Sequence, residues 1–222
     1  MVMKEIIACG SISPELERLR QGHPEVDIRY LPQNLHRAPD KMTTYIQKAL
    51  DELTGNYETV VLGYGLCSNG IVGVKAPDQG LYIPRVHDCI ALYLGGRQAY
   101  EKIFKKHPGT YHLTKSWIVN KTDPLGLVEN EYTQRVGREM AEEAMEREIR
   151  NYEYISFVNT YTDDTDKYRA RARENAEHFH KKFIEYKGSD EYFRKILFGP
   201  YESPDFIYIT PHNEVKQKDF LK

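Results

Sequence analysis

Short apolar runs alternate with helix-like segments along most of the chain, and this alternation constrains the possible folds more than any other sequence feature. Residues 59–64 (TVVLGY) form a continuous apolar run rich in β-branched side chains, which is typical of a buried parallel strand. Between Asp40 and Leu53 the apolar residues recur at helical spacing, and Gly55 is a suitable stop. The same patterns predict strands at 4–8, 27–32, 59–64, 81–86, 111–119, 154–160 and 205–210. They predict helices from Ser13, at 40–53, at 88–105 with a break at Gly95–Gly96, and at 128–150, 164–186 and 189–198.

Strands that alternate with helices form parallel sheets with helices on both faces. We therefore expect an α/β protein with three layers, Rossmann-like, built on a mainly parallel sheet of about six to seven strands. The length of 222 residues suits a single α/β domain over residues 1–222. Two half-units, 1–108 and 109–222, are the alternative organisation, with four predicted strands in the first and three in the second.

Charge and hydropathy narrow the functional classes. The chain has 31 Lys and Arg against 33 Asp and Glu, so its formal charge is −2, which argues against nucleic-acid binding through bulk positive charge. No apolar run reaches the roughly 18 residues that a membrane-spanning helix needs. The first residues lack the basic-then-apolar order of a secretory signal. We expect a cytoplasmic protein with no nucleic-acid partner and no membrane partner.

All three cysteines lie at or just after the ends of predicted strands. Cys9 follows the first predicted strand, Cys67 lies in the glycine-rich loop after 59–64, and Cys89 follows 81–86. Ligands of open parallel sheets bind beyond the carboxyl ends of the strands, so we expect the three thiols at one edge of the sheet. An odd number of widely spaced cysteines does not suit a disulfide scaffold. The alternative is that they are small, buried hydrophobic side chains.

Three thiolates at one site suit two kinds of metal centre. A four-iron cluster held by three cysteines leaves one iron open to a substrate. Zinc takes three cysteines and a fourth ligand, for which His36 and His87 are the candidates. No close C-x-x-C pair is present, so the placement at strand ends carries the hypothesis. The sequence leaves the cofactor open between an iron–sulfur cluster and zinc.

Polar residues beside the predicted thiol site are candidates for binding substrate or for tuning the metal. His36 and Arg37 precede a predicted helix start, where an anion is favoured. Arg85 places a charge in an apolar strand and needs a partner, either Asp88 or a substrate carboxylate. The full set of these candidates is His36, Arg37, Asn69, Arg85, His87 and Asp88.

Other functions stay open at this point. The loop 63–70 has the order G-x-G-x-x-x-x-G and lacks the Lys-Ser/Thr end of a P-loop, which disfavours a phosphate cradle. Cys89 is a candidate nucleophile, with His87 or His36 as its base. A small-molecule-binding module without metal would use the same loops.

Three segments resemble the hallmark motifs of one protein family. They are Leu35-His36-Arg37-x-Pro39, Gly63-Tyr64-Gly65-Leu66-Cys67-x-Asn69-Gly70 and Ile83-Pro84-Arg85-x-His87-Asp88-Cys89-Ile90. The family is domain-of-unknown-function family 1638, a group of uncharacterised proteins that occur largely in anaerobic bacteria and methanogens. Residues 109–117 resemble its next block, whereas Ser68 stands where the family has glycine.

The resemblance implies an anaerobic one-carbon context, because genes of this family occur near corrinoid methyl-transfer systems. A corrinoid methyltransferase is therefore a candidate partner, beside a small-molecule substrate and a second copy of the chain in a homo-oligomer. The chain lacks the D-x-H-x-x-G pattern of base-off cobalamin domains, so we do not expect it to bind a corrinoid in that way. The sequence predicts a metal–thiolate protein with its site at the C-terminal edge of the sheet, either an enzyme or an accessory factor of corrinoid methyl metabolism.

Overall fold

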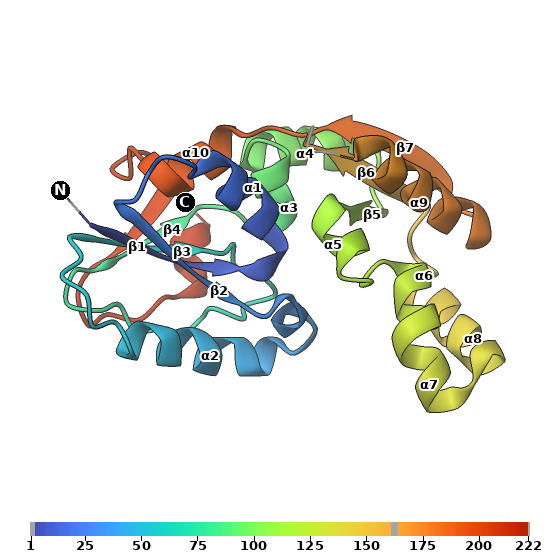
Figure 1. Cartoon of the computed structure of the whole chain (residues 1–222), viewed down its shortest axis with the longest axis horizontal. Helices are drawn as coiled ribbons and strands as arrows, with labels where there is room; N and C mark the ends of the chain where they lie inside the picture. The colour runs from blue at the N-terminus through green and yellow to red at the C-terminus, as the bar shows by residue number, and fades with distance from the viewer. Residues whose placement is uncertain (1–2, 161–163, 222) are drawn as a thin grey trace. The chain divides into compact units, whose positions relative to one another are not determined.

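The computed structural model describes residues 3–160 and 164–221, and the chain divides into two compact units (Figure 1). The first unit comprises Met1–Arg97 and Asp190–Lys222, and the second comprises Gln98–Ser189. These bounds differ from the predicted half-units 1–108 and 109–222, because the last helix and the last strand of the chain return to the first unit.

The first unit contains a five-stranded sheet in the order β2-β1-β3-β4-β8. Strands β1 to β4 pair in parallel, and β8 pairs antiparallel with β4. The elements of this unit are β1 (Lys4–Cys9), η1 (Gly10–Ile12), α1 (Ser13–Leu19), β2 (Val26–Leu31), η2 (Gln33–Arg37), α2 (Pro39–Asp51), β3 (Thr59–Gly63), β4 (Leu81–Pro84), α3 (Cys89–Tyr93), α10 (Glu191–Phe198), β8 (Phe206–Ile209) and η4 (Gln217–Phe220).

Helices cover both faces of the five-stranded sheet, as its buried sequence requires (Figure 1). Helix α2 packs on one face, where Met42 and Ile46 join Ile7 and Leu62 in a single hydrophobic cluster. Helices α1 and α10 contact each other on the opposite face. Because both faces are covered, successive residues of β1 such as Ile6 and Ile7 are fully buried.

The strand order reverses between β1 and β3. The chain runs from β1 outward to β2, and then returns past β1 to β3 and β4 on its other side. In doubly wound sheets the crevice at such a reversal, beyond the carboxyl ends of the strands, is where ligands bind. Cys9 is the last residue of β1, and the loop that carries Cys67 follows β3, so both lie at this reversal.

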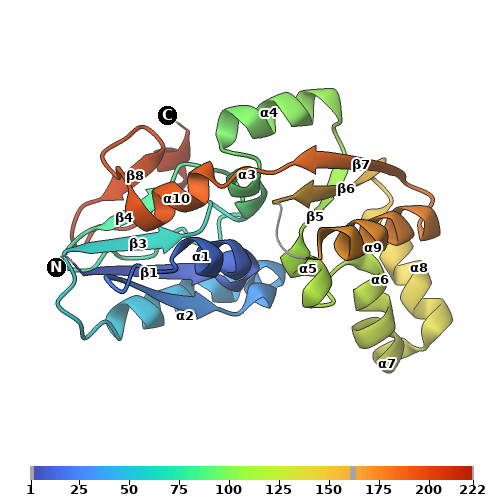
Figure 2. The ribbon, with the colours of Figure 1, turned by 45° about the horizontal axis from the view of Figure 1, so that its top comes forward.

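The second unit contains a three-stranded, fully parallel sheet in the order β5-β6-β7, with α9 packed against β6 and β7 (Figure 2). Its elements are α4 (Arg97–Lys106), β5 (Thr110–Leu113), α5 (Lys115–Val119), α6 (Pro124–Leu127), the π-helix η3 (Val128–Tyr132), α7 (Thr133–Val136), α8 (Arg138–Ile149), β6 (Tyr154–Asn159), α9 (Thr165–His178) and β7 (Lys182–Lys187).

The α/β class with mostly parallel pairing is confirmed, but a single sheet of six to seven strands is wrong. Strands β5, β6 and β7 pair only with one another among the described residues, so the structure has two sheets of five and three strands. The helix predicted at 164–186 ends at His178, and its last part is β7. Charged residues such as Lys182 and Glu185 hid this edge strand, because edge strands tolerate charge.

Two further predicted elements are shorter than expected. The strand predicted at 111–119 ends at Leu113, and helix α5 follows, because the pairing with β6 stops there. The helix predicted at 128–150 is divided at Gly137, whose φ of +83° is outside the helical region.

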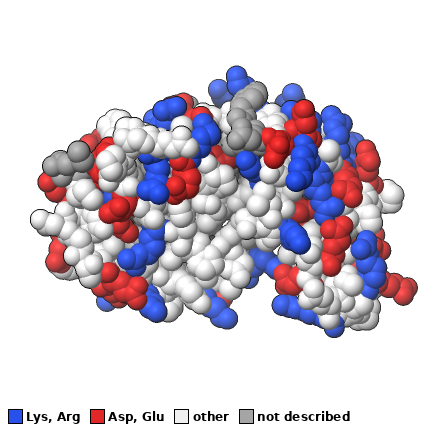
Figure 3. Space-filling view, viewed as in Figure 1, with Lys and Arg blue, Asp and Glu red and all other residues white. Residues whose placement is uncertain are grey.

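No helix within residues 3–160 and 164–221 is both long enough and apolar enough to cross a membrane. On the face drawn in Figure 3, side chains of both charge signs are interspersed. This view agrees with the near-neutral charge of the chain.

Candidate functional site

The loop after β3 is held directly against the segment that carries Cys89. The amide N–H of Leu66 donates to the carbonyl oxygen of Val86 at 3.0 Å, and the N–H of Cys67 donates to that of His87 at 2.8 Å. These two backbone hydrogen bonds keep the segments that follow β3 and β4 side by side beyond the ends of the strands. They bring the Sγ atoms of Cys67 and Cys89 to within 3.9 Å of each other.

Gly65 is the residue that permits this close approach. A Cβ atom on Gly65 would lie 2.9 Å from both the Cα and the backbone nitrogen of Asp88, closer than real Cβ contacts. The glycine-rich sequence of the loop therefore allows its backbone to pack against a second backbone segment, whereas the glycines of a phosphate-binding loop allow the backbone to approach a phosphate.

Cys67, Ser68 and Asn69 all adopt left-handed backbone conformations, with φ values of 47°, 56° and 66°. None of them is glycine, and each such residue costs about 1–2 kcal/mol relative to the right-handed region. Strain of this kind concentrates at functional sites, where the surrounding structure maintains it. The strain falls on the residue that supplies one of the three thiols.

Cys9 completes what we call the thiol cluster, the side chains of Cys9, Cys67 and Cys89. Its sulfur accepts hydrogen bonds from the Oγ of Ser11 at 3.1 Å and from the N–H of Ser11 at 3.5 Å. Cys9 is buried, whereas Cys67 and Cys89 are partly exposed. Cys89 is near enough to Cys9 to affect its ionisation, and its sulfur is 3.9 Å from that of Cys67, so Cys89 is the thiol that neighbours both of the others.

Hydrogen bonding among the thiols affects their ionisation. The neighbouring thiol of Cys89, together with burial, raises the pKa of Cys9 well above its ordinary value. The hydrogen bond with Cys67 is the largest cause that raises the pKa of Cys89. Both thiols therefore keep their protons at neutral pH in the metal-free protein, whereas nucleophilic cysteines have a lowered pKa.

Tyr64 places an unpartnered hydroxyl beside the cluster. Its side chain is fully buried, and its Oη has no hydrogen-bond partner of good geometry among the residues that the structure describes. Burial, with the sulfurs of Cys9, Cys89 and Cys67 close by, raises the pKa of Tyr64 far above its ordinary value. A buried hydroxyl without a hydrogen-bond partner destabilises the folded protein by about 1–3 kcal/mol. The hydroxyl of Tyr64 is a donor of this kind, and it lies next to three sulfurs.

The histidines predicted as fourth ligands do not complete a metal-ligand set. His36 Nδ1 is hydrogen-bonded to the carbonyl oxygen of Gln33, and burial lowers the pKa of His36. His87 is exposed. Within residues 3–160 and 164–221, no group of three or more His, Cys, Asp and Glu side chains is arranged to hold a metal ion. The structure therefore does not support a preformed metal site.

Arg85 has a different environment from the one its sequence position suggested. Its guanidinium donates to the carbonyl oxygens of Pro204, Asp219 and Phe206, at 3.0, 2.9 and 3.2 Å. These bonds attach the end of β4 to the C-terminal segment. The described contacts of Arg85 thus give it a role in the fold.

The other predicted polar residues lie near the loops that carry the thiols. Asp88 caps helix α3 by accepting a hydrogen bond from the N–H of Ala91, and burial raises its pKa. Arg37 and Asn69 are exposed on the loops after β2 and β3. The structure brings together the three thiols, with Asp88 adjacent in sequence to one of them.

Sequence reasoning missed Tyr64 and Ser11, two hydroxyl residues whose side chains lie beside the thiols. Tyr64 directly follows a buried strand, so its position in the sequence could have predicted a buried tyrosine. A buried tyrosine hydroxyl usually needs a hydrogen-bond partner, which would have pointed to this residue. Ser11 was not detectable, because its contact with Cys9 depends on the tight turn η1.

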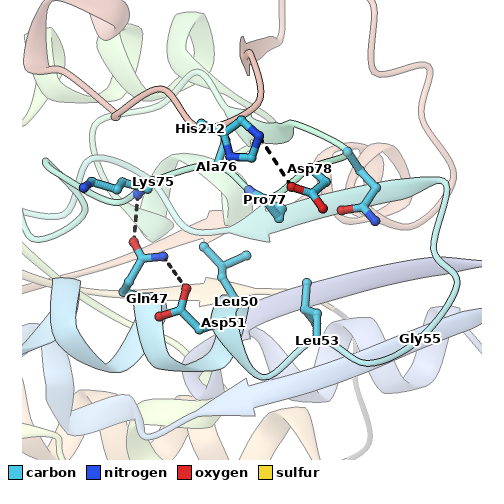
Figure 4. Close-up of a pocket in the computed structure, with 11 residues that line it drawn as sticks. Gln47, Leu50, Asp51, Leu53, Gly55, Lys75, Ala76, Pro77, Asp78 and His212 are labelled. Carbon is cyan, nitrogen blue, oxygen red and sulfur yellow. Dashed lines mark hydrogen bonds and ion pairs between the residues drawn. The ribbon is translucent and has the colours of Figure 1, made fainter.

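A pocket of about 500 Å³ lies at the opposite edge of the same sheet (Figure 4). Its lining comes from the end of α2 and from the segments that precede β3 and β4 and follow β8, which is the amino edge of the parallel strands. Its ion pair, His212 with Asp78 at 3.5 Å, is mostly exposed. The position and the exposed lining both favour the thiol cluster as the functional site.

Comparison with known proteins places the chain in one family without adding a function. No curated protein and no solved structure is significantly similar to it. The model of the family described as "Protein of unknown function (DUF1638)" matches residues 30–197, a stretch that includes Cys67 and Cys89. Since this match spans more than half of the 222 residues, the chain belongs to the DUF1638 family, as its motifs indicated.

Proposed function

We propose that the protein binds a thiophilic metal centre, an iron–sulfur cluster or zinc, through Cys9, Cys67 and Cys89. The observation that carries the proposal is the convergence of three thiols, from three separate strand ends, at the reversal of strand order. Random burial of cysteines gives no reason for such a meeting. Buried thiols otherwise behave as small hydrophobic side chains.

The donor chemistry fits a soft metal centre. Sulfurs that bind one tetrahedral zinc at about 2.3 Å lie about 3.8 Å from each other, and the Cys67–Cys89 distance is 3.9 Å. The described residues are not arranged as a complete ligand set, so binding requires side-chain rotation around Cys89. Metal binding would also remove the thiol protons, and the raised pKa values of Cys9 and Cys89 make this loss costly at those two residues.

Tyr64 supports the same proposal. Its buried Oη is an unused donor beside the sulfurs, and thiolates or cluster sulfides would accept its hydrogen bond. A three-cysteine cluster keeps one iron available to a small-molecule substrate. Whether the protein is an enzyme or an accessory factor of corrinoid methyl metabolism, with a methyltransferase as partner, stays a prediction of the family resemblance.

Metal analysis of protein purified without oxygen tests the proposal. We expect bound iron with sulfide, or bound zinc. Absorption near roughly 400 nm identifies a cysteine-ligated cluster, whereas zinc gives none. Cys9→Ser, Cys67→Ser and Cys89→Ser should each lose the metal, while Ser68→Ala, an exposed neighbour, should retain it. Wild-type protein that stays metal-free with three free thiols after reconstitution contradicts the proposal.

His36→Ala distinguishes the two metals. If zinc recruits His36 as its fourth ligand, this variant should release metal as the cysteine variants do. If three cysteines hold an iron–sulfur cluster, the variant should keep its metal.

A cysteine nucleophile is the less supported alternative, because neighbouring thiols and burial raise the pKa of both Cys9 and Cys89. We expect both to react slowly with iodoacetamide near neutral pH. Rapid alkylation of Cys89 in the metal-free protein would favour the nucleophile instead.

A further inference from the structure

The sulfurs of Cys67 and Cys89 are positioned for a second kind of chemistry. The Sγ atoms of Cys67 and Cys89 are 3.9 Å apart, and both residues are partly exposed. A disulfide bond is about 2.05 Å long, so rotation of the side chains has to close about 2 Å. The backbones are already held side by side by the bonds from Leu66 to Val86 and from Cys67 to His87.

Cys9 is placed differently from this pair. Its sulfur accepts two hydrogen bonds from Ser11, it is only 4% exposed, and it ends the interior strand β1. Cys67 and Cys89 are therefore the pair that an oxidant can join, because their sulfurs are 3.9 Å apart and both residues are partly exposed. Cys9 is left as a single thiol when the other two combine.

We propose that Cys67 and Cys89 form a reversible disulfide under peroxide, and that this bond closes the metal site. The consequence for metal binding rests on the proposed function, whereas the disulfide itself does not. A protein of this chemistry would take up its metal centre only while these two thiols are reduced.

The chemistry needs one molecule of hydrogen peroxide for each disulfide. One cysteine sulfur, as thiolate, attacks a peroxide oxygen, the O–O bond breaks, and the departing hydroxide takes up a proton as water. The second sulfur then attacks the resulting sulfenic sulfur. The S–S bond forms, the S–O bond breaks, and a second water leaves, so two thiols lose two electrons and two protons to the peroxide.

The test treats reduced, metal-free protein with a small excess of hydrogen peroxide and then counts thiols in denaturant. Wild type should keep one of its three thiols, and its mass should fall by about 2 Da. Trypsin cuts at Lys75 and Arg85, so Cys67 and Cys89 fall in different peptides that the disulfide would join. Dithiothreitol should restore all three thiols.

The variants separate the two proposals. Cys9→Ser should form the disulfide as wild type does although it cannot bind metal, whereas Cys67→Ser and Cys89→Ser should form none. Oxidised wild type should take up no metal until it is reduced. Disulfide formation in a protein that never takes up metal would overturn the proposed function and support this bond.

Three outcomes would overturn the disulfide proposal. They are a bridge that includes Cys9, stepwise oxidation of Cys67 or Cys89 to sulfinic acid without a bridge, and failure of Cys9→Ser to form the bond. Undiminished metal uptake by the oxidised protein would overturn its regulatory part.

Discussion

The two units of the molecule each bury a polar cluster, and they do so in opposite ways. In the second unit the carboxylate of Asp123 accepts hydrogen bonds from Gly126 N–H, from Asn175 and from Arg171, which also pairs with Glu129. We call this set the Asp123 network. In the first unit, the three free thiols lie beside Tyr64, whose hydroxyl has no partner of good geometry among the described residues.

The Asp123 network therefore stabilises the fold, whereas the thiol cluster is available for chemistry. In the Asp123 network, donors and charges are matched, and Asn175 also accepts the N–H of Leu125, which attaches α6 to α9. In the thiol cluster, a strained loop carries Cys67, and a donor is left over. Most buried polar groups of folded proteins are hydrogen-bonded, and the exceptions include groups at functional sites.

The largest effect is expected in the Asp123 network. Asp123→Ala leaves the guanidinium of Arg171, which is 20% exposed, without its buried partner and removes the cap of α6. We expect a loss of about 3–5 kcal/mol in the free energy of unfolding. Urea denaturation measures it, with Arg147→Ala in an exposed ion pair as the control that should change stability by less than about 0.5 kcal/mol. A loss below about 1 kcal/mol would show that the network is not structural.

Arg85 tests whether a residue beside the thiol cluster belongs to the fold. Arg85→Ala removes three charged hydrogen bonds to carbonyl oxygens of the C-terminal segment. We expect about 2–3 kcal/mol of destabilisation with metal content per folded molecule unchanged. Normal stability combined with a shifted absorption spectrum would instead assign Arg85 to the metal site.

His112 makes the second unit sensitive to acid. Burial lowers its pKa to about 4, while in the unfolded chain the imidazole takes up a proton near its ordinary value of about 6.5. Between these values the unfolded state binds more protons, so stability rises with pH and is lost as the pH falls from about 6.5 to about 4. We expect a loss of about 2 kcal/mol over this window, measured by urea denaturation at several pH values. His112→Gln should flatten the profile, and an unchanged slope would contradict the assignment.

The smallest effect, and the most informative about function, is expected at Tyr64. Tyr64→Phe removes a buried hydroxyl that has no partner, so the metal-free protein should become more stable by about 1 kcal/mol. The same change should weaken metal retention, because the ligand sulfurs lose a donor. Thermal unfolding of the metal-free protein, followed by metal analysis, measures both. Destabilisation by this substitution would show that the hydroxyl has a structural partner.

Hydrophobic periodicity predicted most of the first unit well, because it indicates which residues of a single helix or strand lie on its buried face. The helix expected at 40–53 is α2, with Met42, Ile46 and Leu50 buried on one face. The expected strand at 59–64 is β3. The missed strand β7 shows the limit of this reasoning, since its alternation is broken by charges that only its edge position tolerates.

The sequence by itself determined that Cys9, Cys67 and Cys89 follow strands, and parallel strands bring their carboxyl ends to one edge. Only the tertiary structure decided that β5 to β7 form a separate sheet, that Arg85 binds the C-terminal segment, and that Tyr64 lies beside the sulfurs. The physical reason is the distance along the chain between the residues that interact. Side-chain burial along an element leaves a local pattern, whereas strand pairing and contacts between loops depend on segments far apart in the chain, whose partners no local pattern names.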